Sequence, residues 1–531
     1  MKPKRKRHMR MKTSTYNYLG TTDPTLDAAQ TSRCTGTSII EAAAGVGALP
    51  AARMVNGVYL KSHNLGHNYE AMAALHGAGS LNGRTRSWWQ TRLNWIQESA
   101  NYQGFQLSLP WGLYETGASG GGNFTHLNYA EKVVNELGAM GKYVILMPYQ
   151  TREFRNGDVT SLSAAEQMRY LLPEDLRTKQ SYVSGKDVLV SQGITVHATT
   201  GAPSNALGAN GDYAHDAATN ILYGPKAGGV YPAGVDLDTN DVRGHWLWDY
   251  AYSYTKQTNG AMGFDLKMYK DTLRNRHARF LQAVAAKFNN NPFVLGITTV
   301  ESPAGEPAYL GNLAGGIVAD GCDAVSDIVD SPNNYGRKVL SGKLMHIQNT
   351  RWLFPNKWFA QDINLPLNSI NFVKEYFDQA QTYKMGATSS DTVWYSAPLV
   401  DPTEPTVGCL VRMSQNVDTM PVMAQCQQYC WESNFNGAPA INSTADYNTR
   451  FEHVWSMVRG GNSTNGLGIN AHMVLIQIET AQSIWRGGSY NGVTVPSLNT
   501  WLKNKFAAEG ITDGSAGLNT TQPSYIGMTG Y

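Results

Sequence analysis

The carboxylate of Glu301 is the first candidate for chemistry, because of the sequence that leads up to it. An asparagine run at residues 289–291 ends an amphipathic stretch, and Pro292 prevents that helix from continuing. Residues 293–300 are apolar and rich in β-branched side chains, which predicts a buried strand with Glu301 directly at its carboxyl end. Parallel strands of α/β proteins present catalytic groups at that end, so Glu301 is a candidate general acid/base.

Other candidates follow similar apolar stretches. Glu479 comes directly after residues 468–478 and is the candidate second catalytic carboxylate. Two carboxylates can share the acid, base and nucleophile roles that cleave a glycosidic bond, and aromatic rings with amides suit the apolar faces and hydroxyls of a sugar. The candidates for substrate binding are Trp111, Glu115, Trp246, Trp394, Tyr395, Gln425, Gln427 and Trp485.

The elements that must position these residues alternate along the chain. Apolar strands are predicted at residues 55–60, 104–109, 143–148, 293–300, 357–362, 392–397, 420–427 and 468–479. Amphipathic helices are predicted at residues 87–101, 126–140, 265–287, 337–353, 370–384, 447–458 and 495–508. This alternation predicts an α/β fold of the (β/α)₈ TIM-barrel type. A doubly wound sheet is the competing fold, but the first strand–helix turn lacks GxGxxG and no P-loop occurs.

Four segments are expected along the chain. Residues 1–53 form an N-terminal extension or arm, and residues 54–510 form the barrel. Residues 149–263, rich in Gly, Asn, Asp and Tyr, are too long for a simple connection, so we expect a long insertion or lid over the active face after the third strand. Residues 511–531 are expected to form a C-terminal tail.

Composition narrows the class of function. The formal net charge of +2 offers no broad basic field, so nucleic-acid binding is expected at most through the basic segment from Lys2 to Lys12. No apolar run approaches the ~18 residues that cross a membrane, and no apolar signal-peptide core follows the basic segment. No CxxC pair or acidic cluster near His63 and His67 suggests a metal, and no cofactor is expected. The expected partner is a carbohydrate; the compartment and the oligomeric state are left open.

Three stretches carry a family resemblance. Residues 104–111 with Glu115, residues 141–146, and residues 291–301 resemble the second, third and fourth strands of the retaining glycoside hydrolases of the (β/α)₈ clan that includes cellulases and β-galactosidases. The resemblance covers about residues 54–510. It implies that Glu301 is the acid/base glutamate that this clan carries on its fourth strand.

Two positions depart from that family pattern. Val300 stands where the clan usually has an asparagine before the acid/base, and Gln425 stands where the seventh strand carries the nucleophilic glutamate. An amide cannot form the glycosyl ester of a retaining enzyme in the ordinary way.

Three interpretations of Gln425 are open. The site could be degenerate or carry an engineered substitution, or the second carboxylate could be another residue, with Glu479, Glu432 and Asp362 available. The chemistry could also need no nucleophile at that position. The sequence therefore predicts a glycoside hydrolase-like protein that acts on an oligo- or polysaccharide, with Glu301 as general acid/base. The alternative is a catalytically degenerate carbohydrate-binding or structural assembly protein on a barrel scaffold.

Overall fold

The structure is a computed structural model of the full chain. It describes the following residues: 52–61, 102–117, 122–149, 151–154, 171–177, 181–183, 186, 189–190, 193–237, 245–247, 250–255, 262–268, 270–299, 334, 337, 340, 349–363, 370–389, 409–426, 441–460, 468–477, 485, 487–490 and 492–527.

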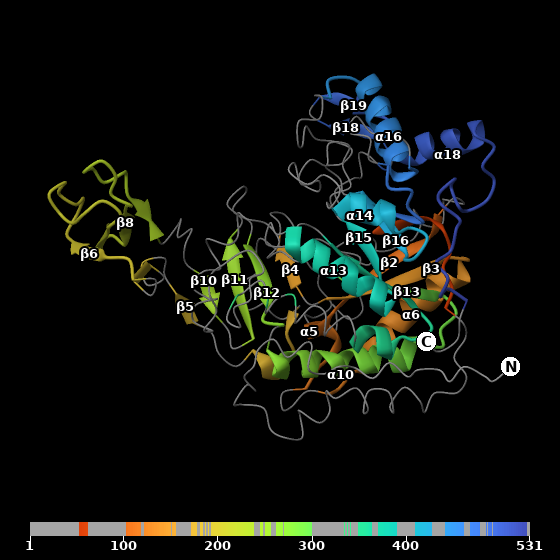
Figure 1. Ribbon diagram of the computed structural model, residues 1–531, viewed down its shortest axis with the longest axis horizontal. Helices are drawn as coiled ribbons and strands as arrows, with labels where there is room; N and C mark the ends of the chain where they lie inside the picture. Colours follow the sequence, from red (N-terminus) through yellow and green to blue (C-terminus); the bar gives the residue numbers. More distant parts are fainter. Residues whose placement is uncertain are drawn as a thin grey trace.

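Eight parallel strands close into a barrel (Figure 1), which confirms the predicted (β/α)₈ architecture. The strands pair in chain order, and the last pairs with the first to complete the ring. They are β1 Gly57–Lys61, β2 Tyr102–Pro110, β3 Tyr143–Tyr149, β13 Val294–Thr298, β14 Trp358–Asp362, β15 Gly386–Ser389, β16 Val422–Cys426 and β17 Met473–Gln477.

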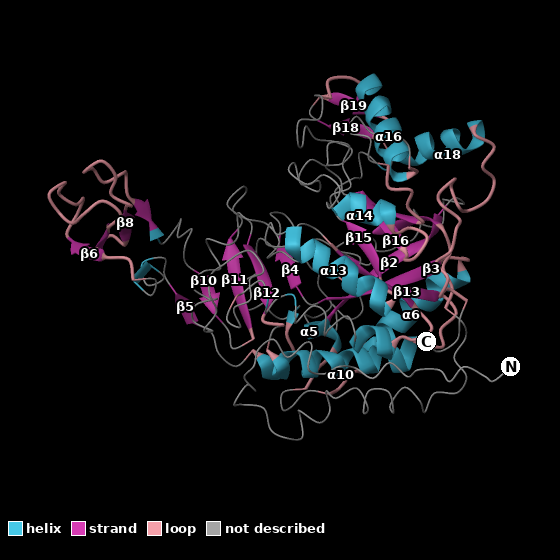
Figure 2. Cartoon of the chain, viewed as in Figure 1, coloured by secondary structure: helices cyan, strands magenta, loops and turns pink. Residues whose placement is uncertain are grey.

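Helices accompany the barrel strands (Figure 2). They are α5 Trp111–Tyr114, α6 Leu127–Ala139, α10 Asp271–Phe288, α13 Ile370–Tyr383, α14 Cys409–Gln415, α16 Thr444–Val458 and α18 Leu498–Ala508. Two of them have a serine N-cap: the Ser443 hydroxyl accepts the Asp446 N–H of α16, and the Ser497 hydroxyl accepts the Thr500 N–H of α18. The predicted helix at 87–101 lies outside the described residues, that at 337–353 is described only in part, and α14 was not predicted.

The sixth strand is not where the sequence pattern placed it. β15 occupies the sixth place, between β14 and β16, whereas the predicted strand at 392–397 lies outside the described residues. Lys384 adopts a left-handed conformation (φ 55°) and Met385 N–H donates to the Ala380 carbonyl, which ends α13 and turns the chain directly into β15. The pattern missed β15 because its residues, Gly-Ala-Thr-Ser, are small and only weakly apolar.

Side chains alternate between the inside and the outside of the barrel, as strand geometry requires. Tyr59, Ile145, Trp358, Met423 and Leu475 form one buried cluster inside it. Their sequence neighbours, such as Leu60, Val144, Ala424 and Val474, belong to the larger core with the helices. Gly296 leaves the space that the Trp358 indole fills, since a Cβ at Gly296 would lie 2.2 Å from an indole carbon. The barrel interior around these side chains is therefore solidly packed.

Residues 511–527 cover the amino end of the barrel. The Asn519 N–H donates to the Ala471 carbonyl (3.1 Å), the Gln522 amide to the Met54 carbonyl (3.0 Å), and the Gly527 N–H to the Ala52 carbonyl (2.8 Å). Ile526 packs against the cluster inside the barrel. Because the contacted residues directly precede β1 and β17, this end is closed and the carboxyl end is left for a site.

Two further sheets lie between β3 and α10. One has the order β4-β12-β11-β10-β5 and the other β6-β7-β8-β9. Figure 1 shows the first beside the barrel and the second at the far end of the molecule. The bounds are β4 Thr151–Phe154, β5 Ser181–Val183, β10 His245–Leu247, β11 Ala251–Thr255, β12 Met262–Leu266, and β6 Val196–Thr199, β7 Tyr213–Asp216, β8 Ile221–Tyr223, β9 Val235–Asp236. That this segment is a lid over the active face stays a prediction.

A hairpin of β18 Gly488–Tyr490 and β19 Val493–Val495 precedes α18. Among the residues that the structure describes, no helix combines the length and apolarity that a membrane crossing requires. The basic segment from Lys2 to Lys12 lies outside the described residues.

Candidate functional site

The structure describes only part of the predicted site. Both predicted catalytic carboxylates and three predicted binding residues lie outside the described residues: Glu301, Glu479, Trp394, Tyr395 and Gln427. Trp246 lies on β10, opposite Tyr182 of β5, in the five-stranded sheet. The remaining four predicted residues are described with their side chains and can be placed: Trp111, Glu115, Gln425 and Trp485.

A layer of polar side chains lies inside the barrel, toward the carboxyl ends of its strands. We call these six residues the polar layer, and each is at most 2% exposed: Gln106 and Ser108 on β2, Thr298 on β13, Asp362 on β14, Thr388 on β15 and Gln425 on β16. Each is either in register with an apolar interior residue of a paired strand or two residues beyond such a position, so it shares the inward direction.

Hydrogen bonds across the barrel confirm that direction. The Gln106 amide Nε2 donates to the Thr298 hydroxyl at 2.8 Å, although β3 lies between β2 and β13. The Gln425 amide Nε2 donates to Asp362 Oδ2, although β15 lies between β16 and β14. Side chains of strands that are not neighbours can meet only within the barrel.

Three side-chain oxygen atoms of the polar layer are buried without a hydrogen bond in the described part of the chain. Gln106 Oε1, Ser108 Oγ and Thr388 Oγ1 are buried and have no hydrogen-bond partner among the described residues. A buried polar atom without a partner costs about 1–3 kcal/mol. These atoms therefore favour a polar ligand inside the barrel, toward the carboxyl ends of its strands.

The polar layer is linked to the segment that leads to Glu301. The Thr299 hydroxyl accepts a hydrogen bond from the Asp362 N–H (3.3 Å), and the Thr299 N–H donates to the Ala360 carbonyl (3.2 Å). The chain leaving β13 is thus held against the end of β14, two residues before Glu301.

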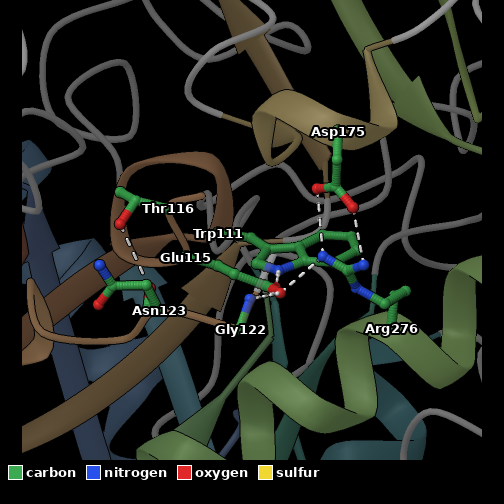
Figure 3. A network of polar contacts seen from close by, with 7 residues as sticks. All are labelled: Trp111, Glu115, Thr116, Gly122, Asn123, Asp175 and Arg276. Carbon is green, nitrogen blue, oxygen red and sulfur yellow. Dashed lines mark hydrogen bonds and ion pairs between the residues drawn. The ribbon is translucent and has the colours of Figure 1, made fainter. Parts of the chain in front are cut away.

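Trp111 and Glu115 lie together in a second, buried network (Figure 3). The Trp111 indole N–H donates to Glu115 Oε2 (2.6 Å), while the Gly122 N–H (3.0 Å) and Arg276 Nη2 (2.7 Å) donate to Oε1. The side chain of Glu115 is fully buried. Its carboxylate is therefore occupied by protein donors on both oxygens.

Arg276 extends this network to a third segment. Its guanidinium, on α10, also binds Asp175 of the short helix η2 Glu174–Leu176 with contacts of 2.8 and 3.2 Å (Figure 3). The Trp111 ring meets the His277 ring edge-on at 4.9 Å between centroids. The network joins the turn after β2, helix α10 and η2; a role of Trp111 and Glu115 in substrate binding stays a prediction.

Trp485 lies apart from the polar layer. It is buried in the large core, and its ring packs against Tyr102 at 4.8 Å between centroids. Tyr102 begins β2, so this contact is at the amino end of the strand, whereas Gln106 and Ser108 lie further toward its carboxyl end. The structure does not bring Trp485 together with Gln425.

Four residues of the polar layer were missed by sequence reasoning, namely Gln106, Ser108, Thr298 and Thr388, and Asp362 was only an alternative. The signal was present on β2, where Gln106 and Ser108 interrupt an apolar strand at alternate positions. Within the described residues, no group of three or more His, Cys, Asp or Glu side chains could hold a metal ion.

Comparison with known proteins leaves the family open. No protein-family model and no curated protein matches this chain. Among solved structures, it is similar to the β-galactosidase from the psychrophilic Marinomonas ef1, with a TM-score of 0.33 and 9% identity. The alignment covers 86% of this chain and 61% of that chain, so this chain spans less than two thirds of the β-galactosidase. A TM-score this low does not establish a shared fold, and the barrel assignment rests on the strand pairing itself.

Proposed function

We propose that this protein is a carbohydrate-active barrel that hydrolyses a glycosidic bond in an oligo- or polysaccharide. The observation that supports this is the polar layer at the carboxyl end of a closed parallel barrel, the end at which such barrels carry their active sites. Amides, hydroxyls and a carboxylate together can both donate to and accept from sugar hydroxyls. Fold alone does not give the activity, so the proposal depends on this chemistry of the interior.

Glu301 is the proposed general acid/base. It follows β13 by three residues, and the intervening Thr299 is bonded to the end of β14. A carboxylic acid at this place would protonate the leaving oxygen of the scissile bond. Glu479, two residues beyond the end of β17, is the proposed second carboxylate. A separation of roughly 5–5.5 Å between two such carboxyl groups predicts retention of configuration, and roughly 6.5–9.5 Å predicts inversion.

A second candidate function is carbohydrate binding without turnover. The observation that favours it is Gln425, an amide on the seventh barrel strand whose Nε2 is already bonded to Asp362. A site with an amide there can hold a sugar without forming a glycosyl ester. Trp246, Trp394, Tyr395 and Gln427 are proposed sugar contacts under either function.

The test is release of reducing ends from a panel of polysaccharides, combined with a binding assay on the same panel. We expect activity on at least one neutral polysaccharide, and loss of at least about 100-fold in kcat for Glu301→Gln with binding retained. The matched control is Glu452→Gln, which changes a half-exposed carboxylate on the outer helix α16 and should leave activity unchanged.

The outcomes separate the two functions. Activity in Glu301→Gln equal to that of the wild type removes this residue from the mechanism. Binding by the wild type without any release of reducing ends replaces hydrolysis by the binding function. Neither binding nor release across the panel rejects both.

A further inference from the structure

The pairing of Asp362 with Gln425 accounts for the amide on the seventh strand. Both side chains are 2% exposed, and the Gln425 Nε2 donates to Asp362 Oδ2. A glutamate at position 425 would bring a second carboxylate into contact with Asp362. Two buried carboxylates at that separation cannot both be ionised, so they must share a proton. An amide at position 425 adds no second negative charge beside Asp362.

Asp362 is held in place by its surroundings. Its backbone N–H donates to the Thr299 hydroxyl, and the Gln425 amide contacts its carboxylate. The neighbouring interior position on β15 is Thr388, paired with Asp362 in the strand register. Asp362 is the only carboxylate in the polar layer as far as the described residues go.

From this geometry we infer that Asp362 supplies the negative charge of the site, moved from the seventh barrel strand to the fifth, and that Gln425 positions it. This inference rests on the proposed hydrolase function. Glycoside cleavage develops positive charge on the sugar ring in the transition state. A fixed carboxylate in a low-dielectric interior stabilises such charge without forming a bond to the sugar. Gln425 is therefore the positioning residue of the pair, and the Asp362 carboxylate acts on the reaction through its field.

The inference makes a charge-swap prediction. Asp362→Asn removes the charge and should lower kcat on the order of 100-fold, while KM changes by less than about threefold. Gln425→Glu should lower the thermal midpoint, because two buried carboxylates then face each other. The double variant Asp362→Asn/Gln425→Glu restores one carboxylate and one amide. It should therefore regain the thermal midpoint of the wild type and have a kcat at least about tenfold higher than that of Asp362→Asn.

Matched controls make the same chemical changes on the surface. Asp378→Asn alters an exposed residue of α13, and Gln415→Glu alters an exposed residue at the end of α14. Both should leave the midpoint and kcat within error of the wild type. The midpoints of all variants are measured by thermal unfolding at about pH 7.

Two results would overturn the inference. One is an Asp362→Asn variant with wild-type kcat. The other is a double variant whose loss of midpoint is the sum of the two single losses, since this would mean that the two side chains do not share one charge. The thermal measurements test the pair even if the wild type releases no reducing ends. In that case the proposed hydrolase function fails together with the electrostatic role of Asp362. The thermal midpoints still show whether the two side chains share one charge.

Discussion

Replacing Arg276 with methionine probes the buried network at the carboxyl end of β2. The substitution removes the guanidinium but keeps most of the apolar stem, so the packing of α10 against its neighbours changes little. Glu115, whose side chain is 0% exposed, loses its ion pair of 2.7 Å, and Asp175, at 12% exposed, loses contacts of 2.8 and 3.2 Å. A buried carboxylate is then left without its cation.

The expected loss in the free energy of unfolding follows from the burial of each partner. Removing one partner of a buried ion pair costs about 3–5 kcal/mol. Glu115 keeps the Trp111 and Gly122 donors, and Asp175 gains water at the surface, so the loss for Arg276→Met should lie at the lower end, about 3 kcal/mol. Because the pair is buried, added salt should change this loss little.

The assay is equilibrium unfolding in urea, compared with thermal unfolding. The matched control is Arg279→Met on the same helix, since Arg279 is exposed and its loss should stay within about 0.5 kcal/mol. The double variant Glu115→Gln/Arg276→Met removes both charges and should lose less than the sum of the two single variants. Equal losses for Arg276→Met and Arg279→Met would refute the reasoning.

Two further predictions concern buried residues of the barrel. Burial lowers the pKa of His472 to about 4 from 6.5, so the unfolded chain takes up the proton first, and stability falls as pH drops from about 6.5 toward 4. His472→Asn should remove a loss of about 2 kcal/mol between about pH 7 and about pH 5; an unchanged pH dependence of unfolding would contradict this. Gly296→Ala places a Cβ 2.2 Å from the Trp358 ring and should cost about 1–3 kcal/mol in thermal unfolding; a wild-type thermal midpoint would speak against it.

The barrel was predictable because its signals are local. Seven of the eight strands overlap the predicted ranges, and four of them lie wholly within, since a buried parallel strand needs a continuous apolar run that can be recognised in sequence. Pro292 and the asparagines before it end α10 just before β13, as expected. β15 was misplaced because a strand of small residues gives no such run; the turn at Lys384 fixes its place.

The polar layer could be predicted only in part. Gln425 was singled out from its position, but its partner on β14 is 63 residues away in the chain. Glu115 and Trp111 were both singled out as binding candidates, but Arg276, which binds Glu115, lies 161 residues away in the chain. Spacing along one strand shows which of its side chains share a face. It does not show which side chains of other strands or helices they contact.

The sequence by itself determined the order of the strands, the helices between most of them and the residue types at their carboxyl ends, because each depends on neighbours within a few positions. Only the tertiary structure decided what those residues bind. Closure of the barrel turns Gln106 toward Thr298 and Gln425 toward Asp362, each across an intervening strand. The same closure gives the amide at Gln425 a carboxylate partner, which no local pattern specifies.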